Sequence, residues 1–157
     1  MEKKVRIVVD PDAEESVVIY CKSVSDDVIA LEKLIVDSFS DLSEMCFERG
    51  GTEYFIPISD ILFFESGEEK VVVHTSDAMY YTSLKLFEIA ELLPSRFMRV
   101  SKSTVVNLMA ISSVCRDVTG SCEVRFYRGN KKIYVSRMYY KLFRQNLDEL
   151  RSYRREK

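Results

Sequence analysis

The chain has 157 residues, of which 46% are hydrophobic and 31% are charged, and its formal net charge is −2. This composition is typical of a folded globule and is too apolar for a disordered chain. The length suits one domain, or one domain with a small appendage, and no apolar run of about 18 residues is present to span a membrane.

Charge is distributed unevenly along the chain. Residues 1–49 and 50–94 each carry a net charge of −6, whereas residues 95–157 carry +10. Asymmetry of this kind indicates a nucleic acid or another anionic partner for the basic part. For the basic tail, residues 151–157, a solvated helix face is an equal alternative.

The N-terminal part, residues 1–45, is predicted to form a small β-β-α unit. Val5–Asp10 and the β-branched run Ser16–Lys22 favour two strands, which a proline-containing turn separates. Ser25 is typical of a helix N-cap, and apolar residues at helical spacing follow over Val28–Phe39. A unit of this size needs another surface to cover its apolar face.

Beyond Gly50-Gly51, interpreted as a domain boundary, the apolar pattern changes to a period of two. Short strands are expected at Glu53–Ile58, Ile61–Glu65, Lys70–Thr75, Ala78–Thr82, Phe97–Val100, Thr104–Asn107, Ala110–Val118, Cys122–Arg128 and Ile133–Ser136. Ser83 is predicted to cap a short helix, Leu84–Leu93, and a longer helix is expected over Met138–Tyr153. Arg128-Gly129-Asn130-Lys131 indicates a hairpin between the last two strands. The order predicts a mostly β, antiparallel fold with short helices.

Signals of catalysis and of metal binding are weak. The single histidine, His74, lies in an expected strand, where a paired or exposed histidine is far commoner than a general base. Cys21, Cys46, Cys115 and Cys122 form no CxxC pair, and we expect reduced thiols that are mostly buried. No nucleotide-binding glycine motif occurs. The sequence therefore predicts a protein that is not an enzyme and holds no metal or cofactor.

One segment carries a more specific pattern. Residues 97–107 read FMRVSKSTVVN and place two cations, several hydroxyls and a terminal amide around a short apolar core. Cations and hydroxyls together are the chemistry of contacts to phosphates and base edges. A polar connection between two strands accounts for this composition equally well.

This segment, followed by Ile111, resembles the central signature of the LytTR family of bacterial DNA-binding domains. Other parts agree in order: Ile61-Leu62-Phe63-Phe64-Glu65-Ser66 with a hydrophobic strand ending in Glu, Lys70–Thr75 with the next strand, Tyr81–Leu93 with a short helix entered from a strand, and Ile133-Tyr134-Val135-Ser136-Arg137 with the closing strand. The resemblance covers about residues 51–150. It implies an elongated antiparallel β domain whose loops enter successive major grooves of DNA.

The resemblance also implies which residues contact DNA. Base-reading positions fall on three loops, at Glu69 and Lys70, at Lys102, and at Arg137. The Arg137 guanidinium can bind guanine O6 and N7 with two hydrogen bonds. Among the base-reading positions that the resemblance implies, Glu69 has the weakest support, because a carboxylate repels phosphates. Phosphate contacts are expected from Ser83 at its helix N-terminus, and from Arg99, Ser101, Ser103 and Lys141.

Structural alternatives stay open for several side chains. Arg99 forms an ion pair with Glu65 or Asp117 in one alternative. Asn107 is expected to serve a turn or the backbone. Tyr139-Tyr140 is expected to pack the last helix instead of stacking on bases.

Residues 1–45 resemble the extension of small stand-alone LytTR regulators and are too few for the receiver domain found in many members. We expect this acidic unit to pack on the DNA-binding domain or to mediate dimerisation. The overall prediction is a cytoplasmic, sequence-specific transcriptional regulator that binds double-stranded DNA as a homodimer on a direct repeat. The alternative is a protein-interaction or ligand-sensing β module with a basic face. The first interpretation requires Lys70, Lys102 and Arg137 to lie on one face.

Overall fold

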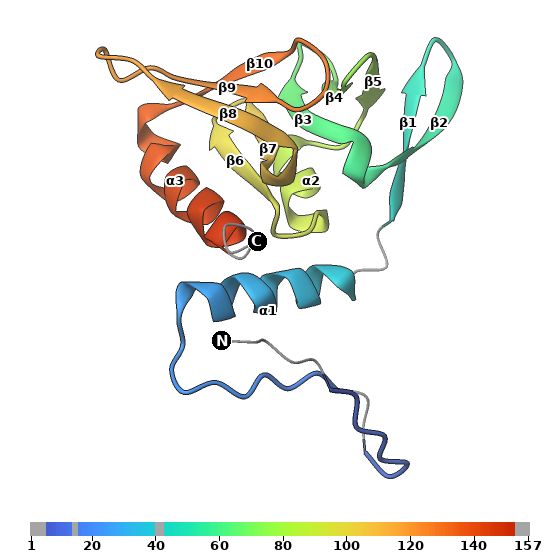
Figure 1. Ribbon diagram of the computed structural model, residues 1–157. Coiled ribbons are helices and arrows are strands. Elements are labelled where there is room, and N and C mark those ends of the chain that lie inside the picture. Colours follow the sequence, from blue (N-terminus) through green and yellow to red (C-terminus); the bar gives the residue numbers. More distant parts are fainter. Residues whose placement is uncertain (1–5, 14–15, 40–42, 153–157) are drawn as a thin grey trace.

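Two antiparallel sheets and three α-helices make up the computed structural model, which describes residues 6–13, 16–39 and 43–152 (Figure 1). The large sheet contains β1 (Glu44–Arg49), β2 (Thr52–Pro57), β3 (Ile61–Ser66), β4 (Val71–Thr75), β5 (Met79–Thr82), β6 (Phe97–Ser101) and β7 (Thr104–Asn107). The small sheet contains β8 (Ile111–Arg116), β9 (Cys122–Phe126) and β10 (Lys132–Val135). The helices are α1 (Asp26–Ser38), α2 (Leu86–Leu92) and α3 (Arg137–Ser152), and short 3₁₀ turns, Ile58–Asp60 and Leu108–Ala110, precede β3 and β8.

Strand order places β3 in the interior of the large sheet. The order is β2-β1-β5-β4-β3-β7-β6 in that sheet and β10-β9-β8 in the small one. Every strand pair is antiparallel, which confirms the predicted fold class of a mostly β protein with helices. Of the helices that the structure describes, none combines the length and the hydropathy needed to cross a membrane.

The core has two halves, one on each face of β3. Successive side chains of a strand point to opposite faces, so Phe63 and Phe64 enter different apolar clusters. Phe63 packs with the small sheet and α3, and its ring stacks on Phe126 at 5.5 Å between centroids. Phe64 packs with α2 and lies edge-on to Phe47 at 6.0 Å. This two-sided cover explains why residues 61–64 form a continuous apolar run instead of alternating.

Helix α1 begins where the sequence predicts and is attached to the rest of the molecule by polar contacts. Ser25 is its N-cap, and the hydroxyl accepts a hydrogen bond from the Val28 amide at 3.4 Å. Lys33 Nζ lies 2.5 Å from Glu149 Oε2 on α3, and this contact lowers the pKa of Glu149. The α1 helix therefore lies beside the end of α3, beneath the two sheets in Figure 1.

The prediction of two N-terminal strands is wrong. Residues 6–13 and 16–25 contain no strand, so the expected strands of the β-β-α unit do not form there; Val5 lies outside the described residues. Gly50-Gly51, interpreted from the sequence as a domain boundary, forms the two-residue turn between β1 and β2, with φ values of 59° and 78°. This left-handed backbone is the one that favours glycine in tight hairpins. Strand β1 itself was not predicted.

Smaller differences concern cysteines and the chain end. Cys122 is buried, but Cys21, Cys46 and Cys115 are exposed, so the expectation of mostly buried thiols is wrong. The basic tail is partly helical, because α3 extends to Ser152, while residues 153–157 lie outside the described part.

Candidate functional site

Three loops that carry the expected base-reading residues lie side by side. The Ser66 amide at the end of β3 donates to the Ser103 carbonyl in the β6–β7 turn at 2.9 Å. The Ser136 amide, between β10 and α3, donates to the Val100 carbonyl at 2.9 Å. The β3–β4 loop, the β6–β7 turn and the start of α3 therefore form one continuous row, which we call the loop edge (residues 66–70, 101–103 and 136–137).

The three cations of the expected site are exposed on this edge. Lys70, Lys102 and Arg137 are all solvent-exposed, and the two backbone bonds place their loops next to one another. The loops that carry the three cations are therefore adjacent, as a shared binding face requires. Lys141 follows Arg137 by four residues on α3, so it faces the same side of the helix.

Arg137 is held by a neighbouring loop. It is the first residue of α3, where the helix dipole disfavours a cation. Its Nη2 donates to the Thr119 carbonyl, in the β8–β9 loop, at 2.8 Å. This contact to a carbonyl offsets part of the dipole effect and fixes one end of the guanidinium, while the side chain stays exposed.

Asp117 organises the loop that holds Arg137. Its Oδ1 accepts hydrogen bonds from the Thr119 hydroxyl at 2.6 Å, from the Thr119 amide at 2.8 Å and from the Ser121 amide at 3.0 Å. The bond from the Thr119 hydroxyl is the main reason that the pKa of Asp117 is lowered. Gly120 has a φ of 86°, and a Cβ added there would lie 3.6 Å from Arg137 Nε. The hydrogen bonds to Asp117 therefore hold the loop that presents the Thr119 carbonyl to Arg137.

The β6–β7 turn is held by its own side chains. Arg99 Nη2 donates to the Lys102 carbonyl at 3.0 Å, and the Ser103 amide donates to the Ser101 hydroxyl at 3.2 Å. Among the described residues Arg99 forms no ion pair with Glu65 or Asp117, so that alternative is wrong. The Arg99 guanidinium is half-buried and supports the turn, which leaves Lys102 as its exposed cation.

Lys70 differs from the other two cations because it has an acidic partner. Its Nζ lies 3.0 Å from Glu48 Oε2 on β1. The Gly51 amide donates to the same carboxylate at 2.9 Å, and this bond, followed by Lys70, lowers the pKa of Glu48. Glu69 is exposed beside Lys70. The β3–β4 loop therefore presents a less positive surface than the sequence suggested.

Ser83 does not cap a helix. The N-cap of α2 is Lys85, and the Lys85 amide donates to the Glu88 carboxylate at 2.7 Å. Ser83 is exposed two residues earlier. The expectation of a cap is wrong, and the carboxylate at this helix end disfavours a phosphate there.

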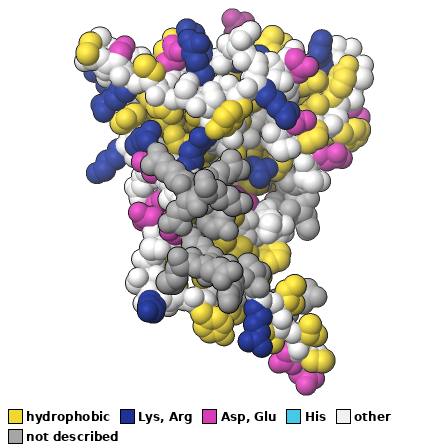
Figure 2. Space-filling view, viewed as in Figure 1, with side chains coloured by type: hydrophobic (Ala, Val, Ile, Leu, Met, Phe, Trp, Pro, Cys, Tyr) yellow, Lys and Arg dark blue, Asp and Glu magenta, His cyan; other side chains and the backbone are white. Residues whose placement is uncertain are grey.

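Some cations of the basic half, residues 95–157, form ion pairs with acidic side chains, and others do not. Arg125 and Lys132 both contact Glu123, and Arg144 contacts Asp148. In contrast, Lys102, Arg137 and Lys141 form no ion pair with any residue that the structure describes. Figure 2 shows Lys and Arg side chains over the upper body of the molecule with acidic side chains among them. Arg116 and Arg128, elsewhere in the basic half, are also exposed and form no ion pair with a described residue. The loop edge and the first turn of α3 therefore hold some, but not all, of the exposed cations that have no acidic partner among the described residues.

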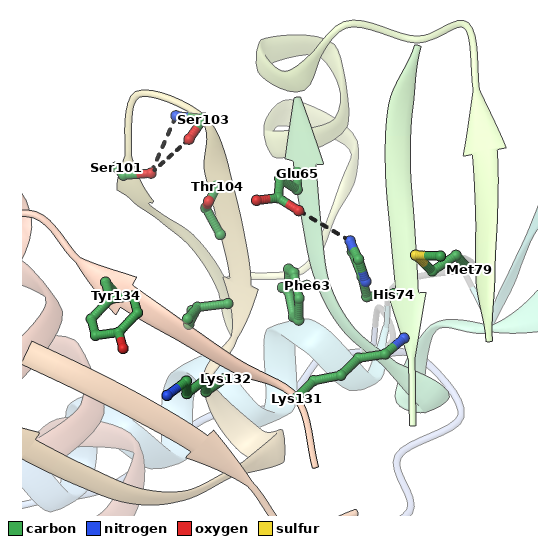
Figure 3. A pocket seen from close by; sticks show the side chains of 11 residues that line it. Phe63, Glu65, His74, Met79, Ser101, Ser103, Thr104, Lys131, Lys132 and Tyr134 are labelled. Carbon is green, nitrogen blue, oxygen red and sulfur yellow. Dashed lines mark hydrogen bonds and ion pairs between the residues drawn. The ribbon is translucent and has the colours of Figure 1, made fainter. Parts of the chain in front are cut away.

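A cleft of about 440 Å³ opens beside the β6–β7 turn, between the two sheets. In Figure 3, Ser101 and Ser103 lie on one side of it and Lys131 and Lys132 on the other. The sequence did not reveal it, because its walls come from strands that are distant in the chain. His74 lies within it.

His74 is a structural, paired histidine, as the commoner interpretation predicts. It stacks on Phe63 at 4.1 Å, and its Nε2 lies 3.2 Å from Glu65 Oε2, although neither ring nitrogen has a well-aligned hydrogen bond to a described residue. Burial lowers the pKa of His74, and the nearby charge of Lys131 lowers it further. Burial also lowers the pKa of Lys131, whose Nζ donates to the Ala78 carbonyl at 2.8 Å. The imidazole is therefore neutral at pH 7.

Packing and backbone roles are confirmed for Asn107 of the signature and for Tyr139 and Tyr140 of α3. The Asn107 side chain donates to the Ile61 carbonyl at 2.9 Å and accepts from the Met109 amide at 3.1 Å. Tyr139 and Tyr140 pack against the apolar cluster under α3, and Arg116 lies 4.2 Å above the Tyr140 ring. These residues build the fold and leave the loop edge as the candidate site.

Known proteins resemble both the sequence and the fold. The LytTr DNA-binding domain family matches residues 52–148. An uncharacterized HTH-type transcriptional regulator of Staphylococcus aureus (strain NCTC 8325 / PS 47) is 26% identical over 149 residues, which cover 92% of this chain and 97% of the relative. Another, from strain MSSA476, is 30% identical over 95 residues, which cover 60% of this chain and 63% of the relative. A solved LytTr DNA-binding domain from Bacillus cereus has a TM-score of 0.62 at 24% identity, and covers 67% of this chain and 96% of that one.

Proposed function

The chain belongs to the LytTR DNA-binding domain family, and we propose that it is a transcriptional regulator that reads specific DNA sequences with its loop edge. The observation that carries the proposal is the row of three loops joined by backbone hydrogen bonds, each with an exposed cation. A row of loops can enter a major groove, which is wide enough for backbone and side chains to reach base edges. Such a regulator acts in the bacterial cytoplasm, where the chromosome lies.

Arg137 is the strongest candidate for a base reader. Its guanidinium is anchored at one nitrogen by the Thr119 carbonyl and has no acidic partner among the described residues. A guanidinium fork binds guanine O6 and N7, so a pre-positioned Arg137 reads one base pair. Lys102 acts as a second reader at the tip of its turn. Lys70 contributes after release from Glu48, and Glu69 reads cytosine N4 beside it.

Phosphate contacts complete the proposed interface. Ser101, Ser103 and Lys141 border the base readers and are suited to fix the register of the protein on the duplex. Arg99 contributes less, because its guanidinium already supports the β6–β7 turn. Ser83 contributes only as an exposed hydroxyl, since no helix begins there. We further propose that two copies bind a direct repeat.

Selection of bound DNA from a random library at two salt concentrations tests the proposal. A DNA reader enriches a motif, and its affinity falls steeply as salt rises because phosphate contacts release counterions. The matched control is the same selection with Arg137→Ala, which we expect to relax the motif at one position. Absence of an enriched motif contradicts the proposal and favours the protein-interaction module with a basic face.

A further inference from the structure

The N-terminal arm, defined as described residues 6–13 and 16–24, exposes apolar side chains that a folded protein normally covers. Ile7, Val9 and Tyr20 are 87%, 85% and 94% exposed, and Val8, Val17 and Val18 are also exposed. Runs of exposed β-branched and aromatic residues mark interaction sites. They also have the highest propensity to form strands.

The arm contains a turn between its two apolar runs but forms no strand ladder with any described residue. The turn between its two runs is formed, because the Asp10 carbonyl accepts from the Ala13 amide at 3.2 Å and the Asp10 side chain accepts from the Asp12 amide at 3.1 Å. The runs on either side of the turn form no strand ladder. A run of β-branched residues with unpaired backbone groups is a template for pairing with another strand.

We propose that the arm is the surface through which two copies of this chain associate, by antiparallel pairing of residues 6–10 with the same residues of a second copy. The sequence of the run, Arg-Ile-Val-Val-Asp, is its own complement. With Val8 opposite Val8 of the second copy, Arg6 faces Asp10, and Ile7 faces Val9. Opposite charges and β-branched pairs across two strands are both stabilising. This complementarity identifies a second copy of the chain as the partner of the arm. The pairing itself does not depend on the proposed function; only the use of the dimer in DNA binding rests on it.

The position of the arm leaves the DNA-binding surface free. The arm lies on the far side of α1 from the two sheets (Figure 1). Helix α1 is attached to α3 through Lys33 and Glu149, and Asp37 accepts hydrogen bonds from Ser95 at 3.1 Å. Residues 22–25, which comprise the end of the arm and the N-cap of α1, belong to no helix or strand. Pairing of two arms therefore does not by itself dictate how two loop edges are oriented on DNA.

Charge reversal tests the pairing in the full chain without DNA. Arg6→Asp places like charges opposite each other at two symmetric positions, and we expect the dimer dissociation constant from sedimentation equilibrium to rise about tenfold. Arg6→Asp combined with Asp10→Arg restores opposite charges in reverse, and we expect the double variant to regain most of the affinity. A wild-type chain that is monomeric at its highest soluble concentration overturns the proposal. So does a dimer that is indifferent to Arg6→Asp.

A disulfide test fixes the register and separates this proposal from DNA binding. We expect Val8→Cys to give a covalent dimer on mild oxidation, while the matched control Asp12→Cys gives no more than the wild type. Equal cross-linking of the two variants overturns the register. Affinity of Arg6→Asp for a single selected half-site should equal that of the wild type. If arms pair but no DNA is selected, the proposed function fails and the arm proposal stands.

Discussion

The run Val71–Thr75 and the run Ser16–Lys22 have similar composition but different structures. The first forms β4, paired on both sides by β3 and β5, and most of it is buried. The second is exposed and unpaired within the described residues. Strand propensity depends on neighbours that complete the ladder and cover the side chains. In the body of the protein, which comprises the two sheets and their helices, neighbouring strands complete the ladder of β4, whereas no described residue does so for Ser16–Lys22.

The largest expected effect is on the free energy of unfolding, and it tests the comparison between the buried core and the exposed arm. Phe64→Ala should lower the free energy of unfolding by about 3–5 kcal/mol, because it empties a fully buried site between α2 and β1. The matched change in the arm, Val18→Ala, should alter it by less than about 0.5 kcal/mol in the monomer. Urea denaturation of dilute protein measures both. A loss of similar size in Val18→Ala would show that the arm packs on the body.

The next effect concerns the loop edge, whose side chains are positioned by the body. Arg137→Ala should cost about 1–3 kcal/mol of discrimination at one base pair of a selected site. Lys141→Ala, one helical turn away, should weaken all sequences alike and reduce the salt slope by about one unit. Titration of the selected site and a single-base variant at several salt concentrations measures both quantities. Uniform weakening by Arg137→Ala would assign that residue to phosphate instead.

The elements of the body could be predicted where local signals and packing agree. Strand β7 has the predicted bounds, and the hairpin at Gly129 and most of α3 were also expected. Strand β1 was missed because only Phe47 within it is buried and charged residues stand at both ends. The arm was predicted as strands because its composition does not reveal whether a neighbour exists to complete a ladder.

The candidate site was predicted only in part for a related reason. The resemblance located the cations, but their surroundings come from distant parts of the chain. Lys70 contacts Glu48, 22 residues away, and Arg137 contacts Thr119, 18 residues away. Such contacts follow from the sheet register, which the sequence pattern did not give. They decide which of the expected cations already have an acidic partner: Lys70 has one, whereas Lys102, Arg137 and Lys141 have none among the described residues.

A smaller effect is expected at Asp117, which acts on Arg137 through the β8–β9 loop. Asp117→Ala removes the acceptor of three hydrogen bonds from Thr119 and Ser121, and so loosens the carbonyl that holds Arg137. Discrimination at the Arg137 base pair should fall, by less than in Arg137→Ala, and the salt slope should not change. In the Asp117→Ala/Arg137→Ala double variant, the loss should equal that of Arg137→Ala alone. Additive losses would mean that Asp117 acts independently of Arg137.

The smallest expected effect is a pH dependence of the free energy of unfolding. It arises from His74, which lies in the sheets and not in the arm. The pKa of His74 is lowered by burial from its ordinary value of 6.5, so the folded state disfavours the protonated imidazole. Well above pH 6.5 the imidazole is neutral in both the folded and the unfolded state, and its contribution to stability is complete. As the pH falls below 6.5, the unfolded chain binds a proton first, and the free energy of unfolding decreases until the pH passes the lowered pKa of the folded state.

His74→Phe isolates this contribution, because it keeps the aromatic ring against Phe63 while removing the titration. The carboxylates with lowered pKa values, such as Glu149, also lose stability in acid, but they are unchanged in the variant. Urea denaturation from pH 7.5 to pH 5 measures the free energy of unfolding of both proteins. As the pH falls below 6.5, the wild type should lose more of this free energy than His74→Phe does. A difference that is constant with pH would mean that His74 titrates alike in both states, and that the cleft does not shield it from water.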